Sequence, residues 1–181
     1  SAPSSSQIQR AVAVLRGSKR PIILAGHGAT RNSAQAALIQ FSEQLHIPVA
    51  TTFMGKGIFP DNHPNSLGTM GFMRRDYANF GFDQADTVIC VGYDLQEFAP
   101  AQINPKGDKN ILHIHRYPAS VDAHYTVTVG IEGNIAETLT ELAREANVSY
   151  EHHATSMKIR QLLQEEREKG KGDSSYPVKP Q

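Results

Sequence analysis

Residues that could carry out chemistry stand where short apolar runs of the sequence end. Gly26-His27-Gly28 follows one run, Gly92-Tyr93-Asp94 follows a second, and His113-Ile114-His115 closes a third. A glycine turn before a helix can hold a phosphate through its backbone amides, and two histidines on one face of a strand can bind a metal ion. Acidic residues near a strand end can act as acid and base. Each of these kinds of site requires particular residue types at particular spacings, which can be checked in the sequence.

The segment from Gly26 to Arg31 resembles a dinucleotide-binding glycine loop, because it leaves an apolar run and precedes a helical pattern. Arg31 stands where the third glycine of that fingerprint would allow close packing of helix on strand. The next apolar run ends in Thr51-Thr52, whereas the fingerprint needs an acidic residue there for a ribose. These departures argue against a nicotinamide site. A phosphate held by the turn stays as one interpretation, and a purely structural turn is the favoured one.

Two further motifs fail in their details. In the segment Met54 to Gly57, Lys56 is followed by glycine where a serine or threonine would bind magnesium, and the glycine that should begin a Walker-type loop is missing. His113 and His115 share a face of a strand, but the sequence offers no evident third metal ligand. We therefore expect a flexible glycine turn and a hydrogen-bonded histidine pair rather than phosphate and zinc sites.

Nucleophilic catalysis also lacks support. The sequence contains no Gly-x-Ser-x-Gly pentapeptide, which a hydrolase of that type needs. Cys90, the single cysteine, lies inside an apolar run and is expected to be buried. Asp94 and Glu97 are an acidic pair at a strand end, and capping of the following turn is the favoured role for both. A sirtuin-like deacylase is poorly supported, since its zinc-binding cysteines are absent. The residues by themselves predict no self-contained catalytic set.

The charge and the composition of the chain limit which classes of binding partner are expected. The 181 residues carry 18 basic and 18 acidic side chains, so the formal net charge is zero. We therefore expect neither nucleic acid nor an anionic membrane surface as a partner. One cysteine cannot build an internal disulfide framework, and no apolar stretch reaches the ~18 residues of a membrane span. These features predict a protein of a reducing compartment, with the cytoplasm as the expected location.

A layered α/β structure must position these residues. The apolar runs lack the alternation of half-exposed strands, so they suit parallel strands that are covered on both faces. Stretches with helical spacing of apolar residues lie between or beside them. Strands are predicted at 21–26, 47–51, 86–92, 110–116 and 125–129, and helices at 7–15, 34–45, 75–85 and 134–146. Open parallel sheets bind ligands at the carboxyl ends of their strands, which is where the glycines and histidines would lie.

The chain has room for one domain with short tails. Residues 1–6 are rich in serine and are interpreted as a linker or an expression remnant, residues 7–150 as the domain, and residues 151–181 as a polar helical linker. The stretch from 53 to 71 is too long for an ordinary connection between a strand and a helix. A connection of that length indicates a functional role.

Three segments in this order resemble the central domain of thiamine-diphosphate-dependent enzymes of the acetolactate synthase type. They are Arg20 to Gly28, Thr52 to Gly71 with its Met-Gly-Lys-Gly turn, and Ala85 to Asp94. The similarity extends from Leu15 to Leu142. It implies an α/β fold with a six-stranded parallel sheet and helices on both faces, a Rossmann-like, DHS-like NAD/FAD-binding fold. The residue patterns alone support five of those strands.

Within this family the chain is more similar to the flavin-free, catabolic acetolactate synthases. The flavin-containing relatives carry an Asp-Asp-Arg run where this chain has Gln96-Glu97-Phe98, and an acidic residue where this chain has His115. A bound FAD is therefore not expected. The alternative is a flavin- or ADP-binding module of a related thiamine-diphosphate-dependent 2-oxo acid decarboxylase or carboligase.

The resemblance also implies which residues would line a site. Cofactor contacts would come from the strand ends, and loops beside them would wall a substrate channel. The cofactor-binding candidates are Gly26, His27, Gly28, Gly92, Tyr93, Asp94 and His113, and the channel-wall candidates are Met70, Gly71, Phe72, Glu97 and Phe98. No catalytic residue and no metal ligand is expected in this chain.

The parent reaction of the family is the condensation of two pyruvates to acetolactate with loss of carbon dioxide. Its thiamine diphosphate and Mg²⁺ are bound by two other domains, one of which uses a Gly-Asp-Gly motif. Neither Gly107-Asp108-Lys109 nor Gly172-Asp173-Ser174 matches that motif. The resemblance thus implies a non-catalytic central domain. Its partners would be the other two domains of the parent chain, within a homo-oligomer of the full-length enzyme.

Overall fold

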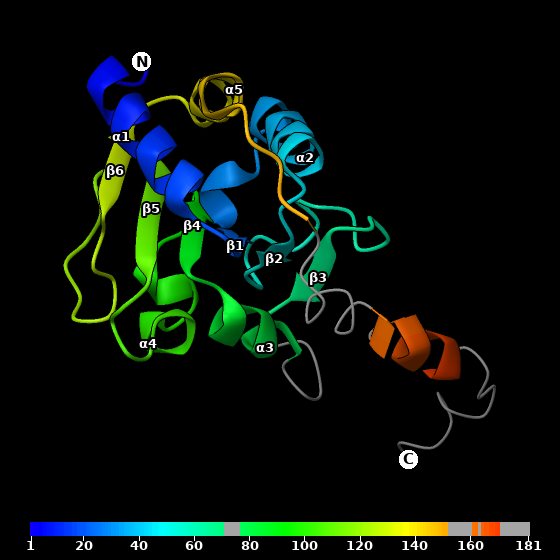
Figure 1. Cartoon of the computed structure of the whole chain (residues 1–181). Helices are drawn as coiled ribbons and strands as arrows, with labels where there is room; N and C mark the ends of the chain where they lie inside the picture. Colours follow the sequence, from blue (N-terminus) through cyan, green and yellow to red (C-terminus); the bar gives the residue numbers. More distant parts are fainter. Residues whose placement is uncertain (71–76, 152–160, 163, 171–181) are drawn as a thin grey trace.

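A parallel sheet forms the centre of the molecule (Figure 1). The computed structural model describes residues 1–70, 77–151, 161–162 and 164–170. Within these residues, six strands follow the order β3-β2-β1-β4-β5-β6, and every neighbouring pair is parallel. The strands are β1 Pro21–Ala25, β2 Val49–Thr51, β3 Ser66–Thr69, β4 Thr87–Val91, β5 Asn110–His115 and β6 Val129–Glu132. This is the strand order of a doubly wound α/β fold, so the fold class predicted from the sequence is confirmed.

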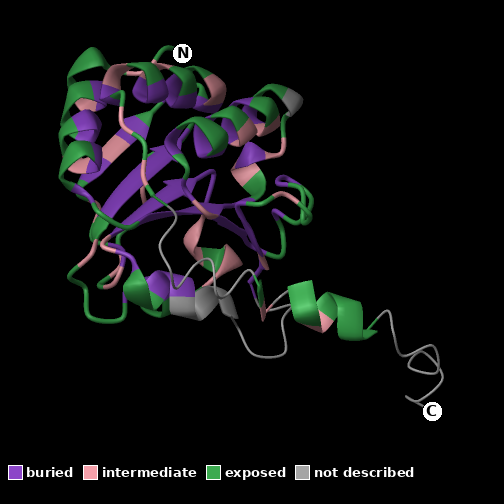
Figure 2. Cartoon of the chain, turned by 45° about the vertical axis from the view of Figure 1, so that its right-hand side comes forward, coloured by how far each residue is buried: buried purple, intermediate pink, exposed green. Residues whose placement is uncertain are grey.

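Helices cover both faces of the sheet. Helices α1 (Ser5–Gly17), α2 (Asn32–Leu45) and α5 (Ile135–Ala146) lie on one face, and α3 (Tyr77–Gln84) and the short α4 (Pro100–Ile103) lie on the other (Figure 1). Two single-turn 3₁₀ helices, η1 (His27–Ala29) and η2 (Leu95–Glu97), follow β1 and β4. Figure 2 shows the sheet buried between helices whose outward surfaces are exposed.

The unbroken apolar runs of the sequence follow from this two-sided cover. Alternate residues of a strand point to opposite faces, so both sets of side chains must be apolar. Ile23 and Ile89 pack toward α1, α2 and α5, whereas Leu24 and Val88 pack toward α3 and α4. All five residues of β1 and of β4 are buried. These two strands therefore form the centre of both cores.

Two parts of the sheet differ from the patterns in the sequence. The predicted strand at 125–129 is wrong, since pairing with β5 begins only at Val129. Tyr125 is instead part of the crossover that precedes β6, and its ring is buried against the α3–α4 side of the sheet. β3 lies inside the long stretch 53–71, where the patterns indicated a loop and only the family resemblance required a further strand.

The carboxylate of Asp86 joins the start of β4 to the turn between α1 and β1. It accepts hydrogen bonds from the Ser18 hydroxyl at 2.5 Å, from the Lys19 amide at 2.7 Å and from the Arg20 amide at 3.1 Å. Burial raises the pKa of Asp86, but these hydrogen bonds outweigh burial and bring the pKa below its ordinary value. The charged carboxylate therefore stabilises the entry into both central strands.

Replacing Asp86 with asparagine is expected to lower the free energy of unfolding at pH 7 by about 1 to 3 kcal/mol, because a charged acceptor of three hydrogen bonds is lost. A carboxyl whose pKa is lowered by folding stabilises the native state above the unfolded-state pKa of about 4, and this contribution is lost as the pH falls through the lowered value. The difference between wild type and Asp86→Asn should therefore shrink below about pH 4. Urea denaturation across pH checks this, with exposed Asp83→Asn as the control; a difference independent of pH would contradict it.

Candidate functional site

The candidate site is the carboxyl edge of the sheet between β1 and β4. The chain leaves β1 toward α2 on one face and leaves β4 toward α4 on the other. Such a divergence opens the crevice in which doubly wound sheets bind ligands. The residue groups predicted from the sequence are brought together here, because Gly26, Gly92 and His113 belong to the ends of the neighbouring strands β1, β4 and β5.

The glycine turns after β1 and β4 are in backbone contact. Gly92 has a φ of +63°, and a Cβ placed on it would lie 2.4 Å from the amide nitrogen of Ala29. A Cβ on Gly26 would lie 2.6 Å from the carbonyl oxygen of Gly92, and the Gly28 amide donates to that same oxygen at 2.8 Å. A side chain at either position would push the two turns apart. The glycines are therefore required by contact between two turns of the chain itself.

The amides of the turn after β1 are used inside the chain. The Gly26 amide donates to the Val91 carbonyl at 2.9 Å, and the amides of Ala29 and Thr30 donate to carbonyls of the turn itself. The His27 amide donates to Glu97. These hydrogen bonds match the structural interpretation of the turn. Binding of a cofactor by Gly26, His27 and Gly28 stays a prediction.

The carboxylate of Glu97 connects three strand ends. Its Oε1 atom accepts from the His27 amide at 2.9 Å and from the Thr52 hydroxyl at 2.7 Å, and its Oε2 atom accepts from the Asp94 amide at 2.9 Å. The Thr52 hydroxyl in turn accepts from the Gly55 amide at 3.0 Å. The segments after β1, β2 and β4 are thereby held by one side chain.

The capping role favoured for Asp94 and Glu97 is confirmed, because the two residues form a capping box at the start of η2. The Asp94 carboxylate also lies 3.3 Å from Nε2 of His115. Nδ1 of His115 accepts from the Tyr117 amide, so Nε2 carries the proton and donates to Asp94. The acidic pair is thus engaged in hydrogen bonds that shape the turn.

His113 is buried within a chain of hydrogen bonds. Its Nε2 lies 2.9 Å from the Tyr117 carbonyl and therefore donates a proton, which leaves Nδ1 to accept from the Tyr125 hydroxyl at 2.9 Å. Burial lowers the pKa of His113, so the neutral ring is favoured. The hydrogen-bonded histidine pair predicted from the sequence is confirmed. Within the described residues, no group of three histidine, cysteine, aspartate or glutamate side chains is placed to hold a metal ion.

Cys90 is fully buried, as expected. Burial raises the pKa of its thiol to about 12, although a hydrogen bond with Tyr125 acts in the opposite direction. A thiol protonated at neutral pH is a poor nucleophile. Tyr93 is buried as well and donates its hydroxyl to the Phe98 carbonyl. Tyr93 and Cys90 therefore serve the packing beneath the carboxyl edge.

The candidate channel-wall residues take different positions. Met70 follows β3, is buried, and donates its amide to the Thr51 carbonyl at 2.7 Å. Glu97 is turned into the crevice, and Phe98 is half-buried against the core on the α3–α4 side. Gly71 and Phe72 lie outside the described residues. A channel lined by these residues stays a prediction.

Sequence reasoning missed Thr52, which is fully buried and pairs with Glu97. A threonine directly after a strand and three residues before Gly55 was the available signal, since such hydroxyls cap tight turns.

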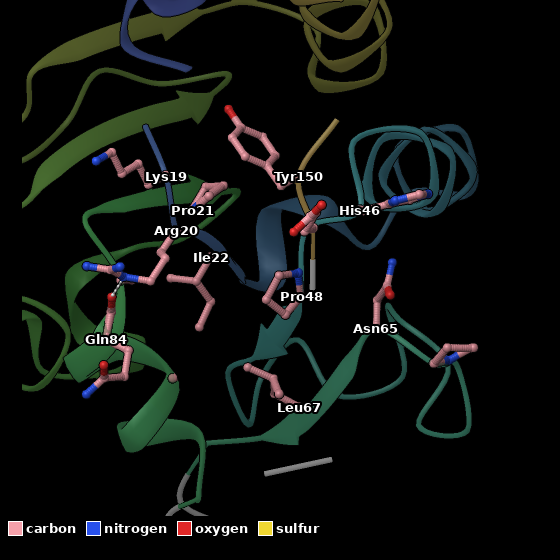
Figure 3. A pocket seen from close by; sticks show the side chains of 14 residues that line it. Lys19, Arg20, Pro21, Ile22, His46, Pro48, Asn65, Leu67, Gln84 and Tyr150 are labelled. Carbon is pink, nitrogen blue, oxygen red and sulfur yellow. Dashed lines mark hydrogen bonds between the residues drawn. The ribbon is translucent and has the colours of Figure 1, made fainter. Parts of the chain in front are cut away.

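The surface of the described residues is hollowed at both edges of the sheet. One hollow lies beside the carboxyl ends of β1 and β5 and the first turns of α2 and α5, and its lining includes Gly28, Arg31, Arg116 and Asn134. The other lies at the opposite, amino edge of the sheet, among Ile22, Pro48, Leu67 and Tyr150 (Figure 3). The second is remote from the polar residues of the strand ends, so the carboxyl edge remains the candidate site.

Comparison with known families agrees with this geometry. The family model for the central domain of thiamine pyrophosphate enzymes matches residues 8–142. The chain belongs to this family. The match covers all six strands, α2, α3, α4 and most of α1 and α5, and it confirms the resemblance stated from the sequence.

Several similar proteins are acetolactate synthases. The chain is 33% identical over 144 residues to a probable acetolactate synthase large subunit of Methanocaldococcus jannaschii. The aligned residues make up 75% of this chain and 23% of that protein. The chain is 34% identical over 140 residues to a probable acetolactate synthase large subunit of Methanococcus aeolicus, covering 77% and 23%. An acetolactate synthase of Arthrospira platensis is 33% identical over 144 residues, covering 75% and 24%.

This member of the thiamine pyrophosphate enzyme family spans about a quarter of the length of the curated relatives it matches. Among its described residues, no helix has both the length and the apolar composition needed to cross a membrane.

Replacing Gly92 with alanine is expected to lower the free energy of unfolding by about 4 kcal/mol. The added Cβ would collide with the Ala29 amide, and the alanine would have to keep the left-handed backbone conformation of Gly92. Gly107 is a matched control: its φ is +66°, but nothing lies within 4 Å of an added Cβ. Gly107→Ala should therefore cost about 1 kcal/mol. Urea denaturation measures both, and equal losses would show that the turns do not meet as described.

Proposed function

We propose that this chain is the non-catalytic central domain of a thiamine-diphosphate-dependent acetolactate synthase. The parent reaction condenses two pyruvates to acetolactate with loss of carbon dioxide. One observation carries the proposal: the polar groups at the carboxyl edge, where this fold places ligands, are hydrogen-bonded to one another through Glu97, Asp94 and His113. The names of the similar proteins support the choice of reaction.

The cofactors are assigned to other parts of the parent protein. As the family resemblance implies, thiamine diphosphate and its Mg²⁺ would be bound by the two other domains of the parent chain. The central domain would join those domains and form one wall of the substrate channel. Met70, Gly71, Phe72, Glu97 and Phe98 are its proposed contributors.

We also infer a homo-oligomeric parent enzyme in the cytoplasm, in keeping with a neutral chain that has a single cysteine.

A second candidate function is binding of a flavin or of ADP. It is favoured by the hollow that contains Gly28, Arg31 and Arg116, because two guanidinium groups suit a diphosphate. The cofactor-binding candidates Gly26, His27, Gly28, Gly92, Tyr93, Asp94 and His113 would belong to this function. A yellow purified protein, or a rise in melting temperature with ADP that Arg31→Ala abolishes, would favour it over the first proposal.

The chain alone is expected to leave pyruvate unconsumed when thiamine diphosphate and Mg²⁺ are supplied, because the proposal places the groups that activate the cofactor on the other two domains. Pyruvate loss and acetolactate formation are measured by coupled absorbance and by chromatography. The full-length parent enzyme is the positive control. Acetolactate formed by this chain alone would refute the non-catalytic role.

A further inference from the structure

The donors around Glu97 form the kind of site that binds an anion. Two backbone amides and one hydroxyl, from segments that follow three different strands, point at one carboxylate. Such convergence of amide and hydroxyl donors is how proteins hold a ligand's phosphate or carboxylate. Here the anion is a side chain of the protein.

The position of this carboxylate coincides with the ligand crevice of the fold. It lies between the turns after β1 and β4, where the strand order of the sheet reverses. A Cβ on Gly26 would lie 2.7 Å from Oε2 of Glu97. The missing side chain at Gly26 therefore makes room for the carboxylate of Glu97, in a turn where glycine usually makes room for a phosphate.

We propose that Glu97 is an internal anion that fills the ligand position between β1 and β4. Removal of its carboxylate would turn this position into a binding site for a small carboxylate such as formate. The three donors would be left without their acceptor, and a bound formate would offer two oxygen atoms in the same place.

Glu97 also acts as a positioning residue for the loop after β2. Thr52 donates to Glu97 and accepts from Gly55, and a Cβ on Gly55 would lie 2.9 Å from the Ala25 carbonyl oxygen. The loop is thereby pressed onto the end of β1. Phe53 and Met54 in this loop are 62% and 54% exposed, so Glu97 fixes a part of the chain that presents apolar side chains at the carboxyl edge.

The experiment compares melting temperatures of wild type and Glu97→Ala with increasing sodium formate. Glu97→Ala should melt about 5 °C or more below wild type. Formate at about 100 mM should restore at least half of that loss, because a ligand that binds the native state stabilises it by mass action. Wild type should respond only as it does to sodium chloride, since its site is filled.

The matched control is Glu132→Ala, which removes an exposed carboxylate at the end of β6 and should show no specific response to formate. Glu97→Gln keeps the shape of the side chain and fills the space, so it should lose stability without rescue. If Glu97→Ala does not fold in chloride, folding recovered in formate but not in chloride supports the proposal.

Equal effects of formate on all variants, or failure of formate to stabilise or refold Glu97→Ala, would overturn the internal-anion role. This outcome is separate from the proposed function. Pyruvate turnover by the chain alone would refute the non-catalytic role and leave the formate response of Glu97→Ala unchanged.

Discussion

The contact between the backbones of the Gly26 and Gly92 turns is the constraint on which the carboxyl edge depends. With no side chain at either position, the two turns approach until the Gly28 amide donates to the Gly92 carbonyl. This approach brings the His27 amide within reach of Glu97 on the far side of the crevice. Any larger residue would separate β1 and β4 at the point where the fold normally admits a ligand.

The carboxylate of Glu97 links the two glycine turns to the neighbouring segments of the carboxyl edge. The turn after β1, the hydroxyl after β2 and the turn after β4 are joined through its carboxylate, and the loop after β2 follows through Thr52. The neighbouring strand end is ordered by His113, whose two ring nitrogens hold the crossover that leads to β6. The polar groups of the described carboxyl edge are thus hydrogen-bonded largely to one another.

Much of this architecture could be predicted from the sequence, because a strand covered on both faces needs an unbroken apolar run. β1, β4 and β5 show such runs. β3 does not, since Ser66–Thr69 contains one large apolar residue and is recognised as a strand only through its pairing with β2. The alternating pattern near Tyr125 suggested a strand. In the structure the Tyr125 hydroxyl is instead hydrogen-bonded to His113, and the strand begins only at Val129.

The candidate site was harder to predict than the fold. Gly26, Gly92 and Glu97 stood out in the sequence, yet the reason for each lies in contacts between residues far apart along the chain. Local patterns suggested a phosphate-binding turn or a structural turn at Gly26. Only the structure shows that the carboxylate of Glu97 accepts a hydrogen bond from this turn and occupies the space beside Gly26. Thr52 escaped notice for the same reason, since its partner follows a different strand.

Hydrogen exchange at the His27 amide tests the closed carboxyl edge most directly. His27 is an exposed residue in a short turn, so its amide would exchange rapidly unless Glu97 accepts from it. The account predicts that this amide and that of Asp94 exchange at least about 100-fold more slowly than in an unstructured chain. Exchange at the unstructured rate, with the Gly26 and Gly28 amides still protected, would contradict the role given to Glu97.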